Sequence, residues 1–172
     1  MKLKGKRIII LIENLYEDLE VWVPYYRLTE EGAKVSLVGP EKKEFKGKYG
    51  YPATPDMSIN EVKVNEIDAV LIPGGFAPDF LRRYDAIVNL VKIAATTGKI
   101  IAAICHGPSV LVSADVLKGK KATSFMAIKA DVINAGAKYL DQEVVRDGTL
   151  ITSRKPQDLP AFCKAIIEAL ES

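Results

Sequence analysis

Hydrophobic residues in this chain gather in short runs that alternate with longer segments of helical spacing. Uninterrupted apolar runs at residues 7–12, 69–72 and 100–104 predict buried parallel strands. Segments 18–31 and 85–97 instead carry apolar side chains at intervals of three and four, and each ends beside a glycine, as helices commonly do. Strands that alternate with helices predict an α/β fold with a mostly parallel sheet and helices on both faces.

The remaining segments fit the same architecture. Further strands are predicted at 34–38, 122–125, 143–146 and 149–152, and further helices at 108–114, 128–135 and 159–170. The last two strands flank Asp147-Gly148, a strong hairpin signal, and the glycine-rich, charged segment 44–51 predicts a small hairpin or extended excursion. No repeat or linker interrupts the pattern, so residues 1–172 are expected to form a single domain.

The composition argues against several classes of function. The chain is 48% hydrophobic, and its 24 basic and 22 acidic residues leave a formal charge of +2, which indicates neither a nucleic-acid footprint nor a polybasic membrane surface. The apolar run near the N-terminus is too short to span a membrane, and no small-residue cleavage site follows it, so a cytoplasmic protein is expected. Cys105 and Cys163 resemble neither a disulfide framework nor a zinc site, and with one histidine a metal site is unexpected.

The most informative stretch is residues 99–113, which read KIIAAICHGPSVLVS. Cys105 lies between a predicted strand and a predicted helix, with the small residues Ala103 and Gly107 two positions to either side. This spacing suits a sharp strand-to-helix turn, a nucleophile elbow with sulfur as the nucleophile. A helix N-terminus favours a thiolate, so the thiol pKa is predicted to be low. The alternative is a buried structural cysteine; Cys163 is interpreted as a core residue of the last helix.

Two neighbours of Cys105 have the chemistry to assist it. His106 is the only histidine and therefore the available base, provided that its side chain turns back beside the sulfur; otherwise it is a partly exposed residue at a helix start. Gly75, which follows Pro73-Gly74, and the backbone N–H of His106 are candidates for an oxyanion hole. An ordinary glycine turn is the simpler explanation of the first.

The sequence leaves the roles of the acidic residues open. Glu17 and Asp18 begin the first predicted helix, where acids stabilise the dipole, but a carboxyl buried beside Cys105 would instead keep its proton and donate a hydrogen bond to the thiolate. Asp79 either caps a short helix or orients His106. In a parallel sheet the segments 13–18, 74–79 and 105–107 all follow strands, so they are expected to meet at one rim.

Four segments together resemble the ThiJ/PfpI superfamily, most of all its PfpI-type intracellular cysteine peptidases. They are AAICHGPSVLVSADVLKGKKATS, LIPGGFAPDFLR, NLYEDLEVWVPYYRLTEEG and INAGAKYLDQEVVRDGTLITSR. The resemblance spans nearly the whole chain and implies a flavodoxin-like sheet, as in class I glutamine amidotransferase domains, which the elbow by itself would also suit.

The resemblance also implies roles for particular residues. The nucleophile would be Cys105, the acid hydrogen-bonded to it Glu17, the histidine His106 and the oxyanion glycine Gly75. A further acid, supplied by a neighbouring subunit, would be Asp79, one methylene shorter than the usual glutamate. A homo-oligomer with active sites near its interface is therefore expected.

The implied activities are peptidase, glyoxalase and deglycase, all cofactor-independent and stress-protective. Their substrates would be small carbonyl compounds, glycated groups or peptides. Phe125-Met126 stands where relatives often carry Tyr-Pro, so a role of that hydroxyl does not transfer. Two alternatives remain open: a redox sensor that uses Cys105 oxidation without turnover, and a chaperone whose surface does the work.

Overall fold

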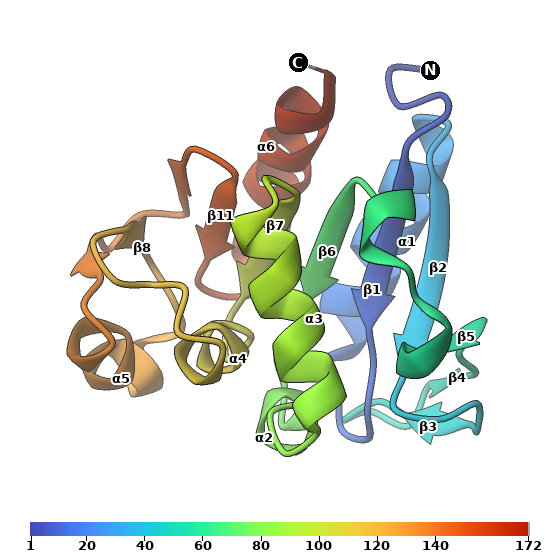
Figure 1. The fold of residues 1–172 in the computed structure, drawn as a ribbon, viewed down its shortest axis with the longest axis horizontal. Helices are drawn as coiled ribbons and strands as arrows, with labels where there is room; N and C mark the ends of the chain where they lie inside the picture. The colour runs from blue at the N-terminus through green and yellow to red at the C-terminus, as the bar shows by residue number, and fades with distance from the viewer. Residues whose placement is uncertain (172) are drawn as a thin grey trace.

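A central sheet carries the fold, and the computed structural model describes residues 1–171 (Figure 1). Within these residues seven strands pair in the order β10-β11-β7-β6-β1-β2-β5, and only the β10-β11 pair is antiparallel. The strands are β1 (Arg7–Leu11), β2 (Lys34–Gly39), β5 (Met57–Ser58), β6 (Ala69–Ile72), β7 (Ile100–Ile104), β10 (Val144–Asp147) and β11 (Leu150–Ser153). The prediction of a mostly parallel α/β sheet is confirmed.

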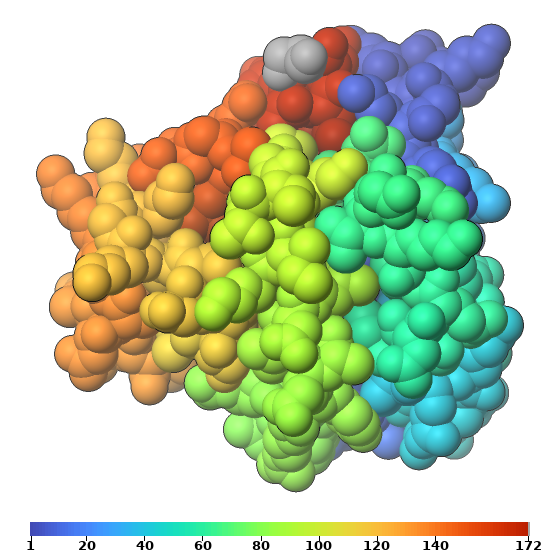
Figure 2. All heavy atoms as spheres, viewed as in Figure 1, coloured from blue at the N-terminus to red at the C-terminus, as the bar shows by residue number. Residues whose placement is uncertain are grey.

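Helices cover both faces of this sheet. The helices are α1 (Asp18–Glu30), α2 (Ala77–Leu81), α3 (Asp85–Thr96), α4 (Pro108–Ser113), α5 (Lys129–Asn134) and α6 (Leu159–Glu171), with 3-10 turns at Ile59–Glu61, Val64–Glu66, Met126–Ile128 and Pro156–Asp158. α1 and α6 contact each other behind the sheet, while α3 contacts α4 in front of it (Figure 1). Figure 2 shows α3 crossing the middle of the front face, where its side chains cover the strands.

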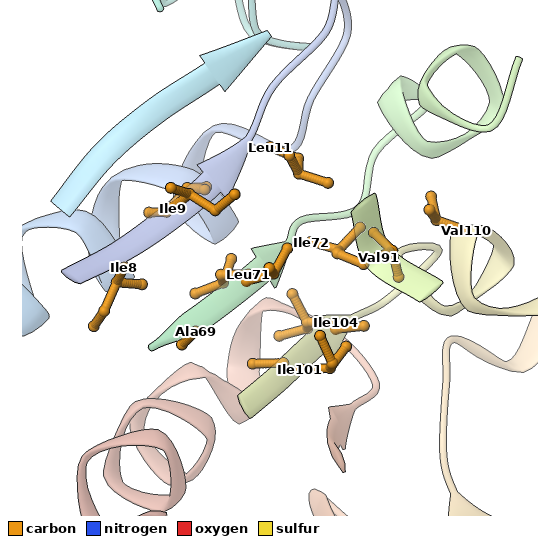
Figure 3. Close-up of a cluster of buried hydrophobic side chains, with 14 of the residues drawn as sticks. Ile8, Ile9, Leu11, Ala69, Leu71, Ile72, Val91, Ile101, Ile104 and Val110 are labelled. Atoms are coloured by element: carbon orange, nitrogen blue, oxygen red, sulfur yellow. The ribbon is translucent and has the colours of Figure 1, made fainter. Parts of the chain in front are cut away.

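The core forms where the central strands meet these helices. Every residue of β6 and β7 is buried, which is the reason their sequences are apolar throughout rather than alternating. Side chains of β1, β6 and β7 lie in one cluster with Val91 of α3 and Val110 of α4 (Figure 3). Because these strands are buried on both faces, their positions are fixed. The loops that follow their carboxyl ends therefore start from fixed points at one edge of the sheet.

The predicted strand 122–125 is wrong beyond Ala122. β8 (Lys121–Ala122) pairs with β9 (Lys138–Tyr139) in a separate two-stranded sheet that contacts β10 and β11. The next residues use their N–H groups elsewhere: Thr123 donates to the Thr152 hydroxyl at 2.9 Å, and Phe125 donates to the Cys105 carbonyl at 2.9 Å. The chain therefore crosses the sheet edge instead of joining it.

The predicted excursion 44–51 forms a hairpin of β3 (Phe45–Lys46) and β4 (Pro52–Ala53). Its connecting loop turns toward the start of α1, where the N–H of Lys48 donates to the Tyr16 carbonyl at 2.8 Å. Among the described residues, no helix has the length and apolar character needed to cross a membrane.

Candidate active site

The turn between β7 and α4 is a strained elbow. Cys105 has a positive φ of 62°, unusual for a residue with a side chain, and its N–H donates to the Ser153 carbonyl at 3.1 Å. A Cβ at Gly107 would lie 2.4 Å from the Ile72 carbonyl oxygen, so only glycine fits there. The predicted nucleophile elbow is confirmed, with the strain concentrated on the cysteine.

Of the two glycines after β6, Gly74 packs against this elbow and Gly75 packs against the segment that leads into α1. A Cβ at Gly74 would lie 2.6 Å from the Cβ of Cys105, and one at Gly75 would lie 2.4 Å from the Leu15 carbonyl oxygen. Because both positions lack a side chain, backbone can approach the sulfur, and the N–H groups of Gly75 and His106 lower the pKa of the Cys105 thiol. These are the two groups proposed from the sequence as oxyanion donors, and they converge on one point.

His106 turns back beside the sulfur, as the sequence analysis required. Its Nδ1 lies 3.4 Å from the Cys105 Sγ, and its ring stacks on Phe125 with centroids 5.0 Å apart. Burial, and to a lesser degree the charge of Lys48, lowers the pKa of His106. The imidazole is therefore neutral at physiological pH and able to accept the thiol proton.

The carboxyl beside the thiol belongs to Glu20, so the prediction that Glu17 contacts Cys105 is wrong. Glu17 occupies the N-cap of α1 with extended backbone, whereas Glu20 lies one turn further along and is fully buried. Glu20 Oε2 accepts from the N–H of Gly74 at 2.6 Å, and the carboxyl interacts with the Cys105 thiol. Burial raises the pKa of Glu20 to about 8, so at neutral pH this carboxyl is protonated.

Glu17 has a different partner. Its Oε2 lies 3.0 Å from the Nζ of Lys48, which the hairpin loop brings to the mouth of the site. Asp18, next to it, accepts from the N–H groups of Tyr49 and Tyr51 at 3.0 and 3.2 Å and so holds the same loop. Sequence reasoning missed both Glu20 and Lys48. The one available signal was the spacing of Glu17 and Glu20, which differ by about one helical turn.

The predicted low thiol pKa is contradicted in the free protein. Burial, and second the charge that Glu20 carries when ionised, raises the pKa of Cys105 to about 12, while the N–H groups of Gly75 and His106 lower it. When Glu20 keeps its proton, the second cause disappears. The thiol therefore needs a base to ionise, and His106 stands at the required place.

Asp79 lies outside this cluster in the chain described. It belongs to the first turn of α2 rather than its N-cap, its side chain is 65% exposed, and its carboxylate pairs with Arg83 at 2.6 Å. A contact with His106 of another subunit stays a prediction.

A cavity of about 550 Å³ opens above the sulfur. It is lined by Glu17, Leu19, Glu20, Lys48, Tyr49, Gly75, Phe76, Cys105, His106, Phe125, Pro156 and Gln157. The predicted rim is thus confirmed, because segments that follow β1, β6 and β7 all contribute to one cavity. Within residues 1–171, no three His, Cys, Asp or Glu side chains are grouped so as to hold a metal ion.

The model of the DJ-1/PfpI family matches residues 6–169. The chain belongs to this family. Among DJ-1/PfpI proteins it is 43% identical to Deglycase PfpI of Pyrococcus furiosus over 165 residues, covering 96% of this chain and 99% of the relative. It is 44% identical to Protein/nucleic acid deglycase 2 of Escherichia coli over 169 residues, covering 96% and 98%.

A solved DJ-1/PfpI structure agrees with the fold. The chain superposes with a TM-score of 0.94 and 46% identity on a two-domain protein of Anabaena variabilis that contains DJ-1/ThiJ/PfpI-like and ferritin-like domains. The match covers 96% of this chain and 48% of that one, so the present chain spans about half of the two-domain protein.

Proposed function

We propose that this protein is a cofactor-independent cysteine enzyme that attacks electrophilic carbonyl carbons, removing early glycation adducts from amines and converting small dicarbonyls. The observation that carries the proposal is the elbow geometry of Cys105, whose φ is 62° and whose sulfur lies 3.4 Å from an imidazole nitrogen of His106. The backbone N–H groups of Gly75 and His106, which lower the pKa of the thiol, support it. The deglycase names of relatives above 40% identity support the same chemistry. We assign the protein to stress protection, in line with its relative General stress protein 18 of Bacillus subtilis, and to the cytoplasm.

The first step uses the groups already assembled. His106 Nδ1 takes the thiol proton as Cys105 sulfur forms a bond to the carbonyl carbon, and the carbonyl π electrons move to oxygen. Gly75 and His106 N–H groups then stabilise the oxyanion, a contribution of about two orders of magnitude or more per donor in comparable sites. Protonated Glu20 donates to the sulfur while it is anionic. A proton returned by His106 completes a hemithioacetal.

The second step needs no external oxidant. In a 2-oxoaldehyde the former aldehyde carbon loses its proton, the neighbouring ketone carbon gains one, and a thioester of a 2-hydroxy acid results. Water then cleaves the thioester, which gives a carboxylate and restores the thiol. Starting from a hemiaminal adduct, the sulfur forms its bond to the carbon that bears nitrogen as the carbon–nitrogen bond breaks. Protonated His106 gives its proton to the leaving amine, and the same hemithioacetal results. The oxidation of one carbon balances the reduction of its neighbour, so cofactor-free turnover is chemically complete.

Cavity size favours small adducts over polypeptides as the reacting group. A volume of about 550 Å³ lies in the range of pockets that take small molecules. Cys105 is 8% exposed and lies at the bottom of the cavity, so a scissile peptide bond in a folded chain would reach it with difficulty. We therefore place peptidase activity second.

The decisive experiment separates adduct cleavage from scavenging of free dicarbonyl. The methylglyoxal adduct of an N-blocked lysine or cysteine is freed of excess methylglyoxal and mixed with wild type or Cys105→Ser, and adduct decay and lactate are followed. We expect wild type to remove the adduct faster than it dissociates spontaneously. If the adduct never decays faster than it dissociates spontaneously, the enzyme converts only the free dicarbonyl. If neither the adduct nor free methylglyoxal yields lactate, the proposal is wrong. Casein peptides in the same panel test the peptidase.

A redox sensor is less well supported. Oxidation of a cysteine depends on its thiolate, and burial raises the pKa of Cys105. Mass spectrometry after mild peroxide treatment decides: selective oxidation of Cys105 without turnover on any carbonyl would favour the sensor. Protection of client proteins by a Cys105→Ala variant would instead favour a chaperone.

We further propose that the protein is a homo-oligomer in which Asp79 of one subunit accepts from His106 of another. The high exposure of the Asp79 side chain, at 65%, leaves it accessible to a second chain. A base that also needs a fixed tautomer benefits from such an acceptor.

A further inference from the structure

The catalytic cavity contains a cation that the chemistry above does not use. Among the residues that line it, Lys48 carries the one ammonium group, and no arginine lines it. Lys48 comes from the hairpin loop, far in sequence from the elbow, so its presence there requires a structural cause.

Contacts with Glu17 and Asp18 hold Lys48 in this position. The Glu17 side chain is 7% exposed and contacts the Nζ of Lys48 at 3.0 Å from within, whereas the Lys48 side chain is 33% exposed and forms the outer member of the pair. Asp18 holds the backbone on either side of the loop tip through Tyr49 and Tyr51. The ammonium pairs with Glu17 and also lies over the Tyr49 ring, 5.4 Å from its centroid, and its three N–H donors exceed what the one carboxylate can use.

Apart from the Asp18 carboxylate, which accepts from the N–H groups of Tyr49 and Tyr51, the surroundings of Lys48 carry little other charge at neutral pH. Burial keeps Glu20 protonated and His106 neutral, so Glu17 is the anion that the ammonium meets. An anionic group that enters the cavity would lie against the exposed side of Lys48, with Glu17 behind it. Partial desolvation strengthens such a charge-assisted hydrogen bond relative to one at an open surface.

We propose that Lys48 is a specificity-determining residue that makes the cavity prefer carbonyl substrates bearing a carboxylate over neutral ones. The preference rests on the proposed function for its biological use, but the charge selectivity of the cavity is a separate property. It can be measured on the thiol without any turnover.

The first test compares two alkylating agents that differ by one charge. Iodoacetate and iodoacetamide both form a bond to the Cys105 thiolate and expel iodide, so the ratio of their rates cancels the thiolate fraction. In a Cys163→Ala background, Lys48→Met should lower the iodoacetate to iodoacetamide ratio on the order of tenfold. Lys48→Arg should retain it, and Glu17→Gln should retain or raise it.

Lys46→Met is the matched control, because Lys46 is exposed on the same hairpin and does not line the cavity. An unchanged ratio in Lys48→Met, or an equal fall in Lys46→Met, overturns the proposal. Thermal melts of all variants establish that they fold. If Lys48→Met does not fold, Lys48→Gln removes the same charge with a polar side chain and takes its place in the test.

The second test uses substrates matched in length: 4,5-dioxopentanoate, which carries a carboxylate, and neutral 2-oxopentanal. We expect Lys48→Met to raise KM for the carboxylate substrate severalfold with little change in kcat, and to leave 2-oxopentanal unaffected. Equal losses on both would reject the assignment. If wild type converts neither compound, the proposed function fails, while the alkylation ratio still decides the role of Lys48.

Discussion

Cys105 and Cys163 are both buried and both free, yet only one has the surroundings of a nucleophile. Burial raises the pKa of Cys105 to about 12 and that of Cys163 to about 11. Each also lines a hollow of similar size, about 550 Å³ at Cys105 and about 560 Å³ at Cys163. Neither burial, cavity volume nor thiol pKa distinguishes the two.

The backbone makes the difference. Cys163 lies within α6, where helical N–H groups are committed to the helix, and the charge of Arg27 lowers the pKa of its thiol only in part against burial. Cys105 has left-handed backbone geometry, and two N–H groups and an imidazole nitrogen face its sulfur. A reactive cysteine is thus recognised by the donors and the base directed at it, and less by how deep it lies.

The largest effect should come from removing each thiol in turn. Cys105→Ala should reduce kcat/KM by about three orders of magnitude or more, because the bond-forming atom is lost. Cys163→Ala should stay within about twofold of wild type while losing some stability from the cavity it leaves. Steady-state kinetics and thermal melts measure both. Comparable activity loss in the two variants would erase the distinction.

The backbone at Gly74 packs closely against Cys105, and Gly74→Ala tests how much this approach contributes to activity. The new Cβ would lie 2.6 Å from the Cys105 Cβ and from Glu20 Oε2, so the elbow must shift. We expect kcat/KM to fall by about two orders of magnitude, as for small misplacements of catalytic groups.

Gly148→Ala is the control for that substitution. Gly148 has a φ of 61° with nothing near its missing Cβ, so strain alone should cost about 1 kcal/mol of stability and leave kcat unchanged. Full activity in Gly74→Ala would show that the elbow tolerates the shift.

The buried acid near Cys105 should make stability depend on pH. The pKa of Glu20 is raised from 4.5 to about 8, so the folded state holds this proton more tightly than the unfolded state. That stabilisation is complete below pH 4.5 and is lost as pH rises through 8. Glu20→Gln cannot ionise, so between pH 5 and 9 it should gain on wild type by a few kcal/mol, on the order expected from the shift. Parallel unfolding curves across this range would contradict a protonated Glu20.

Subunit complementation gives the smallest expected signal. Cys105→Ala and Asp79→Asn are both expected to be inactive, and an equal mixture that exchanges subunits forms hybrids in half of its dimers. One of the two sites in each hybrid pairs an intact Cys105 with an intact Asp79, so about a quarter of all sites should recover. Activity per subunit should also fall on dilution. If the subunits exchange but no activity returns, then either the acid that orients His106 belongs to the same chain or Asp79 has no part in the mechanism.

Local patterns in the sequence predicted what local forces decide. β6 and β7 begin and end where the apolar runs do, because strands buried on both faces are apolar from end to end. The elbow followed from small residues around Cys105, and the rim from the rule that parallel strands end at one edge.

Long-range contacts decided the rest. Whether Glu17 or Glu20 faces the sulfur depends on the rotation of α1 about its axis, which the packing of the helix on the sheet sets. Lys48 is brought in by a hairpin held through Asp18, and no pattern near Lys48 encodes that contact. Long-range contacts also explain why the strand predicted at 122–125 does not form. The N–H groups of Thr123 and Phe125 donate to the Thr152 hydroxyl and the Cys105 carbonyl instead of to a neighbouring strand.

The place of β11 in the sheet affects when a new chain becomes chemically competent. β11 is the last strand to be synthesised, yet it lies beside β7, and its Ser153 carbonyl accepts from the Cys105 N–H. A nascent chain that ends before Ser153 has the cysteine and the histidine but lacks this anchor of the strained turn. Assembly of the elbow therefore waits until the chain has been made at least as far as Ser153.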